Sequence, residues 1–304
     1  MNKNISEYIE RLLQKTAKSD CRLLDSKSIQ YGERLVFTEN KQECSVSIYF
    51  SKKKGISTVV SSNKNNRELI YKKKHLINPI RAELSLEEFE FNNWIGTDES
   101  GKGDYFGPLV VAGFACHDQD LHKLIKLGVN DSKKISDKQV LEITHKLYKN
   151  FKERIKVILL TPQKYNELYD KFRKQNKKLN QVLAWMHSRV ILDLNKKTKI
   201  NNAIIDKFAN DSVIKKSLKD MKHIKIVNKP RAESNPAVAA ASIIARYHFL
   251  KNIEQLSRKL NLEIPLGAGK TIITTGKKIQ QKFGEEELNN VAKTHFKTTK
   301  EILR

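Results

Sequence analysis

Cysteine is scarce in this sequence, and the cysteines present form no pattern. The three are Cys21, Cys44 and Cys116, an odd number without any C-x-x-C pair. This arrangement does not support a disulfide framework or a zinc site. We therefore expect reduced thiols with a structural role.

Long hydrophobic runs are also missing. PLVVAGFAC is among the longest apolar stretches, and it is too short to cross a bilayer. The charged N-terminal sequence MNKNISEYIERLL does not have the pattern of a signal peptide. We therefore expect a cytoplasmic protein that does not associate with membranes.

Acidic residues are few relative to basic ones. The chain has 34 Asp and Glu against 58 Lys and Arg, which leaves a formal net charge of +24. This excess is far larger than solubility requires, and it indicates a polyanionic partner, with nucleic acid as the leading candidate. With 304 residues, 39% of them hydrophobic, the chain can bury a sizeable core in one large domain or two smaller ones.

The N-terminal part is predicted to be a helix followed by a sheet. Apolar residues between Ile5 and Leu13 recur at helical spacing, and the extended segments ERLVFTE, CSVSIYFS and GISTVVSS follow. In the second segment Val46, Ile48 and Phe50 alternate with small or polar residues, and KKKG supplies a hairpin turn. The polar face of this sheet is either a solvated surface or a platform for a phosphate backbone, and both readings remain open.

A linker is predicted at residues 73–92, where charges cluster and periodicity is poor. It divides the chain into domains 1–72 and 93–304. In the second domain strands and helices alternate, which is typical of an α/β fold. The strands NNWIGTD and GPLVVAGFAC are joined by a loop too short for a helical crossover, so we expect an antiparallel hairpin within an otherwise mixed sheet.

Two adjacent carboxylates, Asp98 and Glu99, end the first of these strands. Burying such a pair is costly unless cations compensate, and oxygen-only ligands select hard cations, magnesium above all. A single DE pair is more often a surface feature, but two further acids strengthen the hypothesis. Asp206 ends the apolar strand NAIIDKF, and Glu233 precedes a helix that Pro236 should begin, where helix-end electrostatics is the alternative explanation.

Four segments together resemble a known family: GTDESGKGDYFGPLVVAG, VNDSKKIS, AIIDKFA and AESNPAVAAASIIAR. In this order and spacing they resemble the type 2 ribonucleases H, specifically bacterial ribonuclease HIII, from Asn93 to the C-terminus. The resemblance implies a ribonuclease H-like mixed sheet flanked by helices. The N-terminal part is similar in size and pattern to that family's smaller α+β domain, which resembles the TATA-box-binding protein.

The resemblance also implies an activity, namely endonucleolytic hydrolysis of the RNA strand of RNA:DNA hybrids by two-metal-ion catalysis. The products would carry 5′-phosphate and 3′-hydroxyl ends. Asp98, Glu99, Asp206 and Glu233 would be the catalytic acids and would bind Mg²⁺, with Mn²⁺ as a substitute. The sister ribonuclease HII family has Asp in the fourth place, whereas Glu233 agrees with the AES segment of ribonuclease HIII. We expect a monomer that binds the hybrid and uses no nucleotide cofactor.

Two further segments are predicted to contact the substrate. Glycines let the backbone approach a sugar closely, so the first segment would read the 2′-hydroxyl, although an ordinary turn is the alternative. Its residues are Ser100, Gly101, Lys102 and Gly103. By resemblance the second segment contacts phosphate beside the active site. Its residues are Asn130, Ser132 and Lys133. Ser136 and Gln139, which follow, have the spacing of a capping box, so part of this motif also starts a helix.

Other apparent motifs fail on inspection. Ile264, directly before PLGAGKTIITTG, stands where a P-loop requires its first glycine, and GKGDYFG and DESGKG do not form G-x-G-x-x-G or G-x-S-x-G. The eight histidines form no cluster with metal-ligand spacing. We expect His187 and His248, both in helical segments, to be structural and assign them no catalytic role.

Three alternative functions remain. A non-catalytic nucleic-acid binder would have the same charge, but the four acids argue against it. A ribonuclease HII-like repair enzyme would incise at single ribonucleotides, which the GKG sequence and the N-terminal extension disfavour. Another nuclease of the same broad fold, such as a resolvase or integrase, would share the carboxylates but not these motifs.

Overall fold

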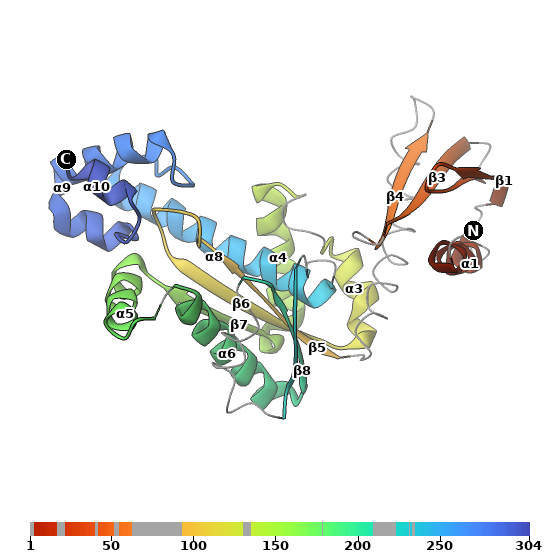
Figure 1. The fold of residues 1–304 in the computed structure, drawn as a ribbon, viewed down its shortest axis with the longest axis horizontal. Helices are drawn as coiled ribbons and strands as arrows, with labels where there is room; N and C mark the ends of the chain where they lie inside the picture. Colours follow the sequence, from red (N-terminus) through yellow and green to blue (C-terminus); the bar gives the residue numbers. More distant parts are fainter. Residues whose placement is uncertain are drawn as a thin grey trace. The chain divides into compact units, whose positions relative to one another are not determined.

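Two separate β-sheets, one of four strands and one of five, organise the chain (Figure 1). They lie in two units, Met1–Glu90 and Phe91–Arg304. The predicted linker falls outside the residues that the structure describes, so the exact domain boundaries stay a prediction. The computed structural model describes residues 3–16, 22–39, 42–51, 55–62, 93–129, 135–177, 179–208, 223–230, 232 and 235–304.

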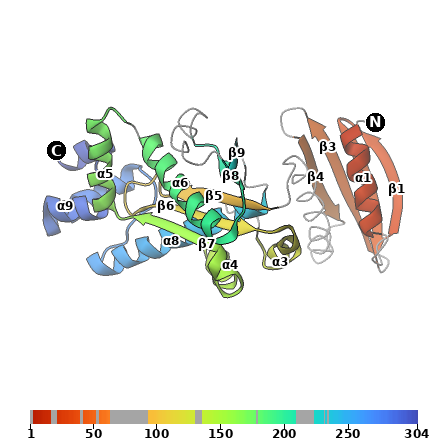
Figure 2. The same cartoon turned by 90° about the horizontal axis from the view of Figure 1, so that it is seen from below.

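The N-terminal unit is a helix packed on an antiparallel sheet (Figure 2). Its elements are α1 (Lys3–Thr16), β1 (Arg22–Ile29), β2 (Gly32–Glu39), β3 (Gln42–Ser51) and β4 (Gly55–Ser62), and the strands are ordered β1-β2-β3-β4. Apolar residues of α1 meet the inward residues of β2 and β3 in a small core. These residues are Ile5, Tyr8, Leu12, Leu35, Phe37, Val46 and Ile48. The predicted order of helix then sheet is therefore confirmed.

One strand of this unit was not predicted. β1 pairs with β2 along the edge of the sheet, but most of its residues are exposed. It therefore lacks the alternation of apolar and polar residues by which a half-buried strand is recognised. The predicted hairpin between β3 and β4 is confirmed, since Ser51 pairs with Gly55, while its turn lies outside the described residues.

The second unit contains a mixed sheet with the order β7-β6-β5-β8-β9. β7, β6 and β5 are antiparallel, whereas β5, β8 and β9 are parallel, so the predicted hairpin and mixed sheet are both confirmed. The strands are β5 (Trp94–Ser100), β6 (Leu109–Cys116), β7 (Ile155–Leu160), β8 (Asn202–Asp206) and β9 (Lys225–Lys229).

Helices cover both faces of this sheet, with α8 across one face and α6 across the other (Figure 1). Ser136 and Gln139 form the predicted capping box at the start of α4, and Asn235 caps α8 with Pro236 in its first turn. The helices are η1 (Asp118–Asp120), α3 (Leu121–Lys126), α4 (Asp137–Phe151), η3 (Lys152–Arg154), α5 (Pro162–Lys174), α6 (Leu179–Thr198), α8 (Pro236–Leu260), α9 (Lys270–Val291) and α10 (Thr298–Ile302).

Glycines allow both helices to approach the central strands closely. A Cβ atom on Gly96 would lie 2.3 Å from backbone atoms of Ala237 and Val238 in α8. A Cβ atom on Gly113 would lie 2.4 Å from the side chain of Val190 in α6. Because both faces are covered, every residue of β6 is buried, which explains why its sequence is a continuous apolar run.

The described part of the chain contains no helix that combines the length and the apolar character needed to span a membrane.

Replacing Gly96 by alanine should destabilise the second unit, because the new methyl group would meet the backbone of α8. Overpacking of this kind lowers the free energy of unfolding by about 1–3 kcal/mol. Urea unfolding followed by tryptophan fluorescence measures the effect, since both tryptophans, Trp94 and Trp185, lie in this unit. Gly103→Ala is the control, because nothing lies within 4 Å of its new Cβ. Equal stability of the two variants would contradict the packing account.

Candidate active site

Asp98 and Asp206 lie at the ends of two neighbouring parallel strands. β5 and β8 pair with Thr97 opposite Ile205, so the next residue of each strand is an aspartate. Successive side chains of a strand point to opposite faces. Asp98 therefore reaches Ser242 in α8, whereas Glu99 reaches α6. Folding thus brings together three of the four predicted acids from distant parts of the chain.

The carboxyl group of Asp98 is difficult to ionise. Its pKa is raised from 3.8 to about 8, first because burial removes water from the charged form and then because Glu99 and Asp206 repel it. Hydrogen bonds oppose this rise without cancelling it. The Ser242 hydroxyl and the backbone N–H of Glu99, 2.8 Å from Asp98 Oδ1, donate them.

Glu99 has the opposite character, although it is the next residue. Burial opposes its ionisation, but hydrogen bonds and positive charge more than offset that effect, so its pKa is lowered from the ordinary value of 4.5. His187 Nε2 lies 3.2 Å from Glu99 Oε2, and Lys102 Nζ lies 3.4 Å from Glu99 Oε1. Each carboxylate oxygen of Glu99 therefore has its own partner.

Asp206 is held at the end of β8 by the segment that leads into α8. Its Oδ1 accepts a hydrogen bond of 2.9 Å from the backbone N–H of Ala232. The carbonyl oxygen of Ala232 in turn accepts a bond of 2.8 Å from the backbone N–H of Asn235, the cap of α8. Glu233, the fourth predicted acid, lies outside the described residues, as do Asn130, Ser132 and Lys133.

The chemistry of these side chains fits a hard divalent cation. Carboxylate oxygens are the donors that such cations prefer, and a bound cation would relieve the repulsion that raises the pKa of Asp98. Within the described ranges no three His, Cys, Asp or Glu side chains are already arranged to hold a metal ion. Lys102 and His187 now contact different oxygens of the Glu99 carboxylate, so the Lys102 contact at Oε1 would have to change if Glu99 joined Asp98 around a cation.

The loop after β5 has a backbone that demands glycine. Gly101 has φ of +86°, and a Cβ there would lie 2.1 Å from the carbonyl oxygen of Pro108. Gly103, in contrast, has open space around it. Between them Lys102 turns toward Glu99 and lies 5.6 Å from the ring centre of Phe208. The loop therefore combines a glycine-specific backbone with a lysine that contacts Glu99.

A buried lysine anchors the far end of this loop. Lys293 is 1% exposed, and its Nζ donates hydrogen bonds to the carbonyl oxygens of Phe106 and Gly107, at 3.3 and 2.6 Å. Burial lowers the pKa of Lys293 to about 7, against the opposing charge of Asp104. The two carbonyls satisfy the two N–H groups of a neutral amine, so the contact survives deprotonation.

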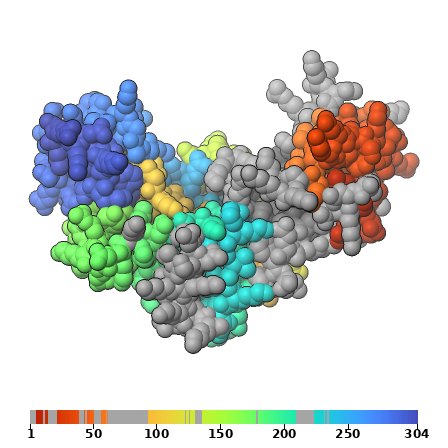
Figure 3. Space-filling model, in the orientation of Figure 1, coloured from red at the N-terminus to blue at the C-terminus, as the bar shows by residue number. Residues whose placement is uncertain are grey.

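The C-terminal segment is fastened to the rest of the unit by side chains that the sequence pattern did not indicate. Asn166 of α5 donates hydrogen bonds to the carbonyl oxygens of Asn289 and Ala292, at 3.1 and 2.9 Å. In Figure 3 the surface of α5 accordingly adjoins that of the C-terminal helices. Lys293 follows directly, so this packing fixes the anchor of the glycine loop.

His187 is the site residue that sequence reasoning missed. It lies in a helix, as predicted, but its imidazole contacts Glu99 and Thr97, which are far away in the sequence. An isolated histidine on a mostly apolar helix carries no signal of such a partner. Only the packing of α6 on β5 brings these side chains together.

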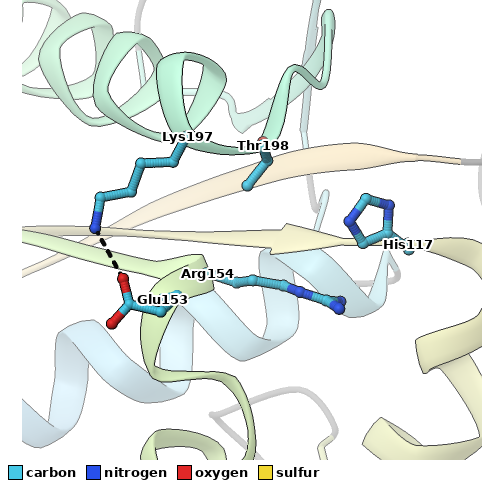
Figure 4. Close-up of a pocket in the computed structure, with 5 residues that line it drawn as sticks. All are labelled: His117, Glu153, Arg154, Lys197 and Thr198. Carbon is cyan, nitrogen blue, oxygen red and sulfur yellow. Dashed lines mark hydrogen bonds and ion pairs between the residues drawn. The ribbon is translucent and has the colours of Figure 1, made fainter.

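A pocket of about 510 Å³ lies elsewhere and includes none of the predicted site residues (Figure 4). Its lining comes from the residue that follows β6, from η3 and from the end of α6, and consists of His117, Glu153, Arg154, Lys197 and Thr198. Lys197 pairs with Glu153 at 3.3 Å, and Arg154 pairs with Asp120. Because these charges are matched within the protein, the pocket does not compete with the carboxylates as the candidate site.

Comparison with known proteins identifies relatives of the second unit. The sequence model of the family described as Ribonuclease HII matches residues 95–299. A protein named Ribonuclease HIII from Protochlamydia amoebophila is 40% identical over 210 residues, which are 69% of this chain and 68% of the relative. A Ribonuclease HIII from Chlamydia felis is 41% identical over 212 residues, 68% of this chain and 69% of the relative.

A solved structure resembles nearly the whole chain. It is described as Bst-RNase HIII in complex with Mn²⁺, and it matches 97% of this chain and 95% of its own length. The TM-score is 0.67 and the sequence identity is 26%. The likeness therefore extends over both units. The resemblance of the N-terminal unit to the TATA-box-binding protein stays a prediction.

Replacing Asp98 by asparagine should stabilise the cation-free protein in alkaline solution. The folded-state pKa of about 8 lies above the ordinary 3.8, so the stability contributed by the protonated carboxyl is present below pH 3.8 and is lost as pH rises through 8. The variant avoids this loss, and its free energy of unfolding at about pH 9 should exceed that of the wild type by about 0.5–2 kcal/mol.

Urea unfolding in the presence of a chelator, at about pH 5 and about pH 9, measures this difference. Asp170→Asn, on the exposed side of α5, is the control and should show no such dependence. Adding Mn²⁺ should stabilise the wild type more than the Asp98 variant. A variant that is less stable than the wild type at about pH 9 would contradict the account.

Proposed function

This chain belongs to the ribonuclease HII family, and from that premise we propose that it is an endonuclease that hydrolyses the RNA strand of RNA:DNA hybrids. Its relatives named Ribonuclease HIII make it a ribonuclease H enzyme. The observation that carries the proposal is the meeting of Asp98, Glu99 and Asp206 at the ends of β5 and β8. A nucleic-acid binder without catalysis would have no use for carboxylates that repel both one another and the phosphate backbone.

We propose that Asp98, Glu99, Asp206 and Glu233 bind divalent cations, Mg²⁺ in the first place and Mn²⁺ as a substitute. The Mn²⁺ in the structure of Bst-RNase HIII supports this assignment. In a two-ion arrangement the bound cations would supply Lewis-acid stabilisation of the charge that develops at the scissile phosphate. Water would lose a proton and form a bond to phosphorus, the bond from phosphorus to the 3′ oxygen would break, and the leaving oxygen would take up a proton. The products are then a 5′-phosphate and a 3′-hydroxyl.

The loop from Ser100 to Gly103 is proposed to distinguish RNA from DNA. Only the 2′-hydroxyl differs between the sugars, and reading it requires donors and acceptors close to the minor groove. The glycine-specific backbone at Gly101 and the open space at Gly103 favour contact through main-chain atoms. Lys102 would move from Glu99 to a substrate phosphate once cations neutralise the carboxylates. Asn130, Ser132 and Lys133 are proposed to contact a neighbouring phosphate.

We propose that the N-terminal unit adds affinity for the duplex. One row of paired residues crosses the four strands on the sheet face opposite α1. In strand order these residues are Lys27, Arg34, Ser47 and Val59. Small side chains with basic neighbours allow close approach of a phosphate backbone. Arg34 is exposed, and its Nη2 lies 3.1 Å from Ser45 Oγ.

The activity is tested with two end-labelled duplexes, a full RNA:DNA hybrid and a DNA with one embedded ribonucleotide, each with Mg²⁺ and with chelator. We expect Mg²⁺-dependent cleavage of the hybrid. Efficient incision at the single ribonucleotide would instead indicate a ribonuclease HII-like specificity. Binding without cleavage would overturn the proposed function.

Asp98→Asn should lower kcat for the hybrid by about 100-fold or more, because it removes a cation-binding oxygen that stabilises the transition state. Hybrid affinity should stay close to the wild-type value, since the substitution leaves the proposed phosphate contacts in place. Single-turnover cleavage and equilibrium binding measure the two effects, and Asp170→Asn is the control for a lost surface carboxylate. An equal loss of binding would argue for a structural role.

Arg34→Gln should weaken hybrid binding and reduce the salt dependence of affinity by about one unit of slope, as expected when one phosphate contact is lost. kcat at saturating substrate should not change. Binding titrations at several salt concentrations test this. Arg258→Gln, which removes an exposed charge near the end of α8, is the comparison. Unchanged affinity and slope for Arg34→Gln would contradict the assignment of this face.

A further inference from the structure

His187 is a buried polar side chain on a helix whose other buried residues are mostly apolar. Its side chain is 1% exposed, and the α6 residues around it that face the core include Met186, Val190 and Ile191. A polar ring in such a place destabilises the fold unless both nitrogens find partners. Both do, because Nδ1 lies 2.8 Å from Thr97 Oγ1 and Nε2 lies 3.2 Å from Glu99 Oε2.

The two partners determine the direction of each hydrogen bond. An ionised carboxylate can only accept, so His187 Nε2 carries the proton that is donated to Glu99. In the neutral ring Nδ1 is then an acceptor, and the hydroxyl of Thr97 can donate to it. Thr97 and Glu99 are two residues apart on β5, so both side chains point to the α6 face. One imidazole ring therefore spans the distance between them.

The ring is also held from the side of β8. It stacks on Phe208, two residues beyond Asp206, with ring centres 4.7 Å apart and an angle of 15° between the planes. Lys102 Nζ lies 5.6 Å from the centre of the same Phe208 ring and 3.4 Å from Glu99 Oε1. His187 is thus fixed between the ends of the two strands that bear the acids.

We propose that His187 is a positioning residue for the reaction, which orients the Glu99 carboxylate so that it can share a divalent cation with Asp98. This inference rests on the proposed function. Lys102 has to leave Glu99 Oε1 when a cation arrives, whereas His187 can keep its bond to Oε2 throughout. The imidazole therefore prevents the carboxylate from rotating when its other partner departs. Partners of ligating groups typically contribute 10–100-fold to metal affinity or activity.

Two substitutions of similar polarity separate this role from a structural one. Glutamine places its amide nitrogen near the position of Nε2, so His187→Gln can still donate to Glu99. Asparagine is shorter and places its amide near the position of Nδ1, so His187→Asn can contact Thr97 but cannot reach Glu99. His187→Leu removes both bonds. His248→Leu is the control, since His248 Nε2 makes a comparable half-buried contact of 2.7 Å with the hydroxyl of Tyr148.

The test has two measurements on the full chain. Electron paramagnetic resonance measures Mn²⁺ binding, and cleavage assays measure how hybrid cleavage depends on the Mn²⁺ concentration. We expect His187→Asn and His187→Leu to bind Mn²⁺ about 10-fold or more weakly and to need correspondingly more Mn²⁺ for half-maximal cleavage. His187→Gln should stay within about 3-fold of the wild type. KM for the hybrid at saturating Mn²⁺ should be unchanged in all three, and His248→Leu should alter thermal stability only.

Wild-type Mn²⁺ affinity in His187→Asn and His187→Leu would overturn the inference, as would a His187→Gln variant no better than His187→Asn. If His187→Leu does not fold, the comparison of Gln with Asn decides alone. A wild-type chain that neither binds Mn²⁺ nor cleaves the hybrid would overturn the proposed function and this inference with it. A competent wild type with unaffected His187 variants overturns this inference and leaves the proposed function standing.

Discussion

Repulsion among the carboxylates at the ends of β5 and β8 is the constraint on which the site depends. Burial and the charges of Glu99 and Asp206 together keep the pKa of Asp98 near 8, whereas His187 and Lys102 keep Glu99 ionised. Neighbouring carboxyl groups thus have different charge states near neutral pH. A divalent cation would offset this repulsion and so allow Asp98 to ionise.

Close packing of α8 and α6 on the central strands positions these carboxylates. Gly96 admits α8 and Gly113 admits α6 to the central strands, and each helix brings one hydrogen-bond donor to the carboxylates. Ser242 comes from α8 and His187 from α6, on opposite faces of β5. Strand alternation explains this division, because adjacent residues point to opposite faces. The glycines that allow this close packing therefore bring both donors within reach of the acids.

The end of the glycine loop is held by residues that are distant in the sequence. Lys293 binds the carbonyl oxygens of Phe106 and Gly107, and Asp104 Oδ1 accepts a hydrogen bond of 2.7 Å from the backbone N–H of Gly267. The residues that follow Gly103 are thus fixed from more than one direction. A loop that is proposed to read a sugar hydroxyl gains selectivity from such rigidity, because its main-chain groups cannot adapt to the wrong sugar.

The sequence by itself determined the features that depend on local chemistry. Charge indicated a polyanionic partner, motif order indicated the family, and the capping residue Ser136 and the proline Pro236 marked where α4 and α8 begin. The alternation of apolar and polar residues did not predict β1, because that strand is mostly exposed. No local pattern indicated the partners of Lys293 or His187. Those contacts were decided only by the tertiary structure, since they join residues distant in the chain. The pKa of Asp98 was decided there too, because burial and neighbouring charges exist only once the strands and helices have packed.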